Sequence, residues 1–77
     1  MPQQLNNVLA FTVNVSEIET RINGQLAGRV FGFRLLPTER GLVLKGSACT
    51  FHAKQLAQHA VMDATDIPIA SNEIDVG

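Results

Sequence analysis

One stretch of the sequence, residues 49–63, gathers the side chains best suited to chemistry. It holds the single cysteine, Cys49, and both histidines, His52 and His59, followed by Asp63. On a helix His59 and Asp63 lie one turn apart on the same face, where imidazole and carboxylate can ligate a divalent metal. His52 lies about 10 Å from His59 along such a helix, too far to share one ion. His59 and Asp63 are therefore the candidate metal ligands, and the alternative is a solvated helix flank with a His to Asp contact.

Cys49 close to His52 suggests a second chemistry, that of a thiol nucleophile. A neighbouring imidazole and a helix N-terminus both favour a thiolate. However, the sequence offers no orienting acid and no oxyanion donor for such a site. A single cysteine also excludes an intrachain disulfide and a four-cysteine zinc site, although it permits a disulfide to a second copy in an oxidising compartment. We therefore expect a non-catalytic protein without a cofactor, and keep a small metal- or thiol-dependent enzyme as the alternative.

The length and the charge of the chain exclude several classes of function. A chain of 77 residues forms one domain, and 45% hydrophobic with 17% charged residues excludes disorder for most of it. The basic residues are scattered and the net charge is -1, whereas binding to nucleic acid needs clustered cations. The Gly-x-x-Gly loop with which KH domains clamp RNA is missing, so a KH-like RNA binder is a weak alternative and no nucleic-acid partner is expected. The longest apolar stretch, Val8–Val13, is far shorter than a membrane span, and no Lys or Arg precedes it as in a signal peptide.

The first part of the chain predicts an extension followed by a helix. We assign residues 1–14 to an N-terminal extension, either flexible or a short edge strand, and residues 15–77 to the domain. A helix is expected to begin near Ser16, because Ser16 and Glu19 have capping-box spacing, as do Asn14 and Glu17. Gly28 is the expected stop. Four apolar residues form one stripe on this helix: Val15, Ile18, Ile22 and Leu26.

From Val30 onward the apolar period becomes two, which indicates strands. Residues 30–36 and 42–48 flank the turn-forming segment Pro37–Gly41 and predict a β-hairpin. Thr50 is the expected N-cap of a second helix. Its predicted inner face is built mostly of small side chains: Ala53, Leu56, Ala57, Ala60 and Ala64. Residues 67–76 contain two pairs of apolar residues, and the alternation of the second pair is shifted by one residue from that of the first. We therefore expect a bulge or bend around residues 70–72.

These elements predict an α+β fold with the order αββαβ, in which two helices pack on one face of a three-stranded mixed sheet. Strand alternation then separates the core from an outer face. The residues expected in the core are Phe31, Phe33, Leu35, Leu42, Leu44, Ile74 and Val76. The residues expected on the outer face are Val30, Arg34, Leu36, Val43, Lys45, Ser47, Glu73 and Asp75.

Part of this outer face is the candidate partner-binding site. It consists of Val30, Arg34, Leu36, Val43 and Lys45, which mix apolar and basic side chains. The alternative is a solvated face with ion pairs from Arg34 or Lys45 to Glu73 or Asp75.

The second half of the chain resembles a known family. The segments Gly41–Gly46, Lys54–Ala57 and Ile67–Val76 are similar in order and spacing to those of the BON domain, named for bacterial osmotic-shock-protection and nodulation proteins. The similarity covers about residues 16–76. The chain departs from the family pattern at residues 65–66, where Thr and Asp replace the usual Gly before the last strand, and at Cys49.

The resemblance implies an αββαβ module from a bacterial envelope, periplasmic or secreted protein, with no set of catalytic residues. It also implies binding to a phospholipid membrane or another envelope component. The residues themselves point elsewhere, because the chain has no polybasic patch and neither expected helix has the basic polar face of an interfacial helix. We therefore rank a protein partner or self-association above phospholipid.

Overall fold

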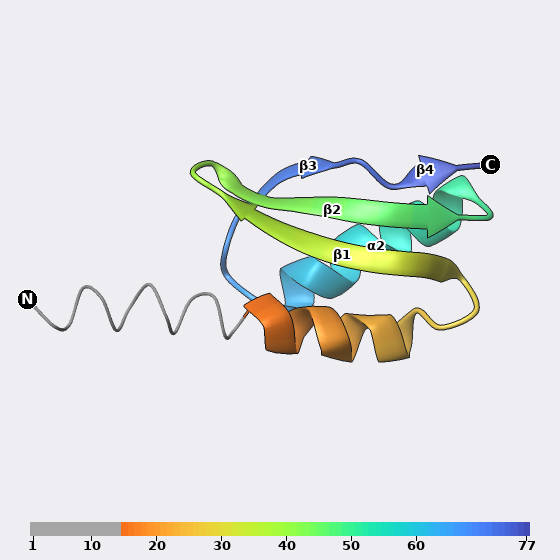
Figure 1. Cartoon of the computed structure of the whole chain (residues 1–77), viewed down its shortest axis with the longest axis horizontal. Helices are drawn as coiled ribbons and strands as arrows, with labels where there is room; N and C mark the ends of the chain where they lie inside the picture. The colour runs from red at the N-terminus through yellow and green to blue at the C-terminus, as the bar shows by residue number, and fades with distance from the viewer. Residues whose placement is uncertain (1–14) are drawn as a thin grey trace, which may run out of the picture.

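The computed structural model describes residues 15–77, which form one sheet with both helices on one of its faces (Figure 1). The N-terminal helix is described over residues 15–25. It is followed by β1 (Val30–Thr38), β2 (Gly41–Ala48), α2 (Phe51–Ala64), β3 (Ile69–Asn72) and β4 (Asp75–Val76). β2 is central, antiparallel to β1 and parallel to β3 and β4. The predicted α+β class and element order are confirmed, with the last strand divided in two. The extension predicted over residues 1–14 lies outside the described residues.

A hydrophobic core joins the two helices to the sheet. Its largest fully buried side chains are Phe33, Ile22, Leu42, Leu44, Ile74 and Val61. On α2, Ala53 and Ala57 are buried as predicted, and such small side chains let the helix approach the sheet closely. Thr50 caps α2 as predicted, because its Oγ1 accepts a hydrogen bond from the N–H of Ala53 at 3.1 Å. No helix within residues 15–77 has the length and apolar character needed to cross a membrane.

The N-terminal helix is already formed at Val15, the first described residue. Val15 is already helical, and the carbonyl of Ser16 accepts a hydrogen bond from Thr20 Oγ1 at 3.1 Å. Ser16 therefore lies inside the helix and does not cap it, while the alternative cap, Asn14, lies outside the described residues. The predicted stripe is confirmed, since Val15, Ile22 and Leu26 are buried and Ile18 is partly buried. The helix ends before Gly28, as expected.

A β-bulge interrupts β1. The strand register shifts between Phe31 and Arg34, so that Gly32 and Phe33 together face the single residue Gly46 in β2. Gly32 has a φ of +63°, a left-handed conformation that costs glycine little and other residues much more. One extra residue turns every side chain that precedes it to the opposite face of the sheet.

This bulge overturns two predictions about β1. Val30, predicted on the outer face and within the partner-binding set, is only 4% exposed and belongs to the core. Phe31, predicted in the core, is 52% exposed. Phe33 and Leu35 follow the bulge and are buried as predicted.

The last strand contains a bulge, as the shift in the alternation of its apolar residues predicts. Leu42 is opposite Ile69 and Val43 is opposite Ser71, so Ala70 is the extra residue of a second bulge. Ile74 is buried as predicted. Val76 was predicted in the core, but it is 44% exposed. It occupies the last paired position of the sheet, where neighbours cover a side chain from fewer sides.

Asn72 links the last strand to α2 through side-chain hydrogen bonds. Its side-chain amide donates hydrogen bonds to the carbonyl of Lys54 at 3.1 Å and to Oε1 of Gln58 at 3.2 Å. Its Oδ1 accepts from the N–H of Ile74 at 3.3 Å, which bridges the interruption between β3 and β4. One polar side chain therefore sets the spacing between the helix and the strand.

The approach of β3 to β2 depends on Gly41, so a substitution of this residue tests it. It is buried with a φ of +134°, and a Cβ there would overlap the carbonyl of Pro68, whose oxygen accepts from the N–H of Leu42 at 2.9 Å. We expect Gly41→Ala to lower the free energy of unfolding by about 2–4 kcal/mol, through strain and overpacking. The control is Gly24→Ala in the N-terminal helix, where nothing lies within 4 Å of the added Cβ. It should raise stability by about 0.5–1 kcal/mol. Urea unfolding monitored by circular dichroism measures both changes. Equal changes in the free energy of unfolding in the two variants would contradict the close approach of Gly41 to the carbonyl of Pro68.

Asn72 provides a second test of the fold. Asn72→Ala removes all of its hydrogen bonds and leaves partly buried partners without them, so we expect a loss of about 1–3 kcal/mol in the free energy of unfolding. Gln58→Ala removes only one of these bonds and should cost less. If the two variants unfold at the same urea concentration, the hydrogen bonds of Asn72 do not link the last strand to α2 as we describe.

Candidate functional site

The sheet has a face that neither helix covers (Figure 1). We call it the outer face. Residues that pair across strands point to the same side of a sheet, so the strand register identifies its members. They form three rows across the strands: Leu36, Val43 and Ser71; Arg34, Lys45 and Glu73; and Phe31, Ser47 and Asp75.

Apolar side chains lie exposed on the outer face. Phe31 is 52% exposed and Leu36 is 40% exposed, while Val43 between them and the last strand is half-buried. Four of the five predicted partner-binding residues, Arg34, Leu36, Val43 and Lys45, therefore lie on this face, and Val30 does not. Phe31 takes the place of Val30 as its apolar member on β1. The signal that could have revealed Phe31 is Gly32, because a glycine within an alternating strand often marks a bulge.

The middle of the outer face carries an ion pair. Lys45 Nζ lies 3.1 Å from Glu73 Oε1, which is one of the ion pairs expected under the alternative of a solvated face. Ser71 Oγ donates to Glu73 Oε2 at 2.8 Å. The hydrogen bond from Ser71, followed by the hydrogen bond and charge of Lys45, lowers the pKa of Glu73 below its ordinary value. Both ion-pair partners are exposed, so the pair orients side chains more than it stabilises the fold.

Arg34 forms its ion pair with the N-terminal helix. Its Nε lies 3.2 Å from Oε1 of Glu19 in the N-terminal helix, so it does not use Glu73 or Asp75 as its ion-pair partner. The reason is that β1 is an edge strand of the sheet and lies beside that helix. Asn23 of the same helix donates to the carbonyl of Phe33 at 3.1 Å, which satisfies a backbone acceptor at the bulge.

The chemistry-bearing residues are divided between the two ends of α2. Cys49 and His52 lie at its N-terminal end, where they line a hollow of about 340 Å³ with Arg29. His59 and Asp63 are exposed in its second half. Among residues 15–77 there is no group of three or more His, Cys, Asp and Glu side chains placed to hold a metal ion. The metal role of His59 and Asp63 therefore stays a prediction that rests on two ligands.

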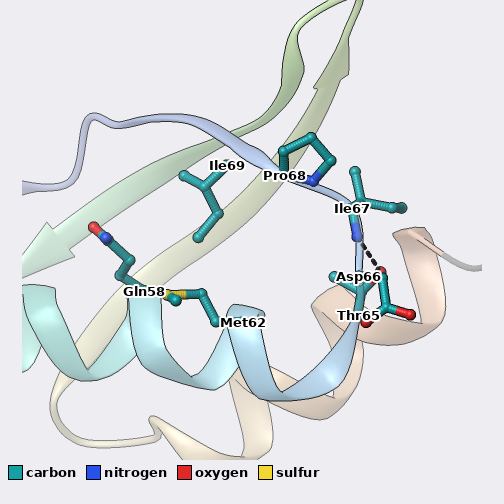
Figure 2. Close-up of a pocket in the computed structure, with 7 residues that line it drawn as sticks. All are labelled: Gln58, Met62, Thr65, Asp66, Ile67, Pro68 and Ile69. Carbon is teal, nitrogen blue, oxygen red and sulfur yellow. Dashed lines mark hydrogen bonds between the residues drawn. The ribbon is translucent and has the colours of Figure 1, made fainter.

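A groove lies between α2 and the segment that enters β3 (Figure 2). It has a volume of about 460 Å³. Its lining residues are Gln58, Met62, Thr65, Asp66, Ile67, Pro68 and Ile69. Figure 2 shows Ile69 pointing from the strand toward α2, where Gln58 and Met62 lie. Sequence reasoning missed this groove because Met62 lies outside the small-residue face of α2, and only the return of the chain past α2 creates the second wall.

Comparison with known proteins assigns no relationship, since no family model, curated protein or solved structure matches the chain. The resemblance to the BON domain therefore stays a prediction from the sequence.

The interaction between Ser71 and Glu73 predicts how the outer face responds to pH. We expect Ser71→Ala to raise the pKa of Glu73 toward the ordinary value of 4.5, because a donor to the carboxylate is lost. Since the folded-state pKa is depressed, the contribution of Glu73 to stability is present above its unfolded pKa and is lost as pH falls through the lower folded pKa. A carboxyl 13C NMR titration measures the shift. Ser47→Ala, one row away on the same face, is the control that should leave Glu73 unchanged, and an unaltered pKa in Ser71→Ala would refute the assignment.

Proposed function

We propose that this chain is a non-catalytic interaction module of the BON type that docks a protein partner through the outer face of its sheet. The observation that carries the proposal is the apolar set Phe31, Leu36 and Val43 on a face that neither of the two described helices covers. The set flanks a charged row. Exposed aromatic and apolar side chains are enriched in protein contacts, and here they lie on both sides of the charged row.

The charges of the outer face suit a protein better than an anionic membrane. Lys45 is paired with Glu73 and Arg34 is paired with Glu19, so each of these cations already has a counter-charge. Electrostatic binding to anionic phospholipid uses clusters of basic side chains beside the membrane, whereas the net charge here is -1. We therefore rank a protein partner, beginning with a second copy of the chain, above a phospholipid or another envelope component.

Val43 is the position from which to test this ranking. We expect the amide resonances of outer-face residues in a 15N–1H NMR spectrum to shift as the protein concentration rises. Val43→Asp should abolish these shifts, because it places a charge directly beside Leu36 on the outer face, while the far-ultraviolet circular dichroism stays unchanged. Val76→Asp is the matched control, since Val76 is also exposed but is paired with Ala48, whose side chain points into the core. It should retain the concentration dependence.

Anionic phospholipid vesicles added to the dilute protein form the second arm of this test. Shifts caused by vesicles but not by concentration would show that the ranking is wrong and would favour lipid binding. A spectrum that responds to neither would contradict self-docking through the outer face.

A further inference from the structure

The charges on the outer face are polarised across the strands. Arg34 on the edge strand β1 and Lys45 on β2 are basic, and they lie opposite each other in the strand register. Glu73 and Asp75 lie on the other side of β2, in the last part of the sheet, and are acidic. The face is therefore positive toward β1, negative toward β4 and balanced between the two signs. Such a surface is complementary to a copy of itself whose edges are exchanged.

Two copies that meet face to face are related by a two-fold axis in one of two main directions. An axis along β2 exchanges the edges, so that Arg34 of each copy lies opposite Glu73 of the other. An axis across the strands places each edge over itself, and Arg34 then lies opposite Arg34 of the second copy. Opposite charges attract and like charges repel, so the distribution of charge selects the axis along β2.

The same axis also covers the apolar side chains of the outer face. Val43 lies on β2, so the two Val43 side chains meet near the axis. Leu36 and Phe31 on β1 lie over the last strand of the other copy, and both are exposed in the single chain. Sheets that pack face to face lie about 10 Å apart, with strand directions within about 30° of each other. Covering these side chains removes apolar surface from water, which is favourable.

Arg34 and Glu73 are accessible for contact with a second copy. The side chain of Arg34 is 66% exposed, and its ion pair with Glu19 is formed through Nε. A guanidinium carries five N–H donors, so it can bind a second carboxylate through its terminal nitrogens. The side chain of Glu73 is 51% exposed beside Lys45. This ion pair also offsets the charge of Lys45, which lies near the axis and would otherwise repel Lys45 of the second copy.

The hollows on the helical side of the sheet lack this complementarity. The groove beside α2 carries the single charged residue Asp66. The hollow beside Cys49 carries the basic residues Arg29 and His52. A surface with charge of one sign repels a second copy of itself, whereas the outer face attracts one.

We propose that the partner of the outer face is a second copy of the chain, packed face to face about a two-fold axis along β2, with Arg34 of each copy paired to Glu73 of the other. The inference rests on the function proposed above, and it specifies the partner and the orientation in which that partner binds.

Charge reversal in two separate variants tests this arrangement. Sedimentation equilibrium of the natural chain should show monomers and dimers in exchange. Arg34→Glu and Glu73→Lys should each weaken dimerisation by at least about tenfold, because both contacts about the axis become repulsive. An equimolar mixture of the two variants should dimerise again, since each contact then joins opposite charges. The 15N–1H NMR spectrum of labelled Arg34→Glu should therefore shift only when unlabelled Glu73→Lys is added.

Two controls separate this effect from a change in net charge. Arg21→Glu gives the same net charge as Arg34→Glu, but Arg21 lies on the N-terminal helix, on the other side of the sheet. Asp63→Lys on α2 gives the same net charge as Glu73→Lys. Both control variants should dimerise as the natural chain does.

Three results would overturn the inference. Dimerisation that is unchanged in Arg34→Glu and Glu73→Lys but lost in Val43→Asp would exclude this orientation and leave docking through the outer face in place. Two variants that stay monomeric when mixed would show that Arg34 and Glu73 do not meet across the axis. A natural chain that stays monomeric would exclude a second copy as the partner.

Discussion

β2 hydrogen-bonds to every other strand of the described sheet, and the alternation of its side chains divides the molecule into two sides. Leu42 and Leu44 are fully buried against the helices, whereas Val43 and Lys45 point to the outer face. Because side chains alternate strictly along a strand, neither set can move without moving the other. The register of β2 therefore determines both the core and the surface that we propose for partner binding.

The two bulges adjust the neighbouring strands to this register. The bulge at Gly32 brings Val30 into the core and turns Phe31 outward, so it adds an aromatic side chain to the outer face. The bulge at Ala70 lets Ile69 and Ile74 both contribute to the core. Bulges also interrupt the regular edges at which sheets aggregate. On β1, Asn23 of the N-terminal helix further occupies the backbone carbonyl of Phe33 at that edge.

The outer face and the groove beside α2 lie on opposite sides of the sheet. The outer face is open on one side of the sheet, whereas the groove lies on the side that carries the helices. Asn72 lies between the two surfaces, since it belongs to the last strand and is hydrogen-bonded to α2. Its hydrogen bonds hold one wall of the groove at a fixed distance from the sheet.

The sequence by itself determined the elements, their order, the N-cap at Thr50 and most of the core, because apolar periodicity and capping act over a few residues. It also included the pair between Lys45 and Glu73 among the ion pairs expected for a solvated outer face, and it placed four of the five candidate partner-binding residues on that face. Only the tertiary structure decided the places of Val30 and Phe31, the pairing of Arg34 with Glu19, and the groove at Met62. Each of these depends on how one strand is aligned with another, or on where a helix lies against the sheet. Such alignments join residues far apart in the chain, and the one local signal among them is Gly32, which marks the bulge beside Phe31.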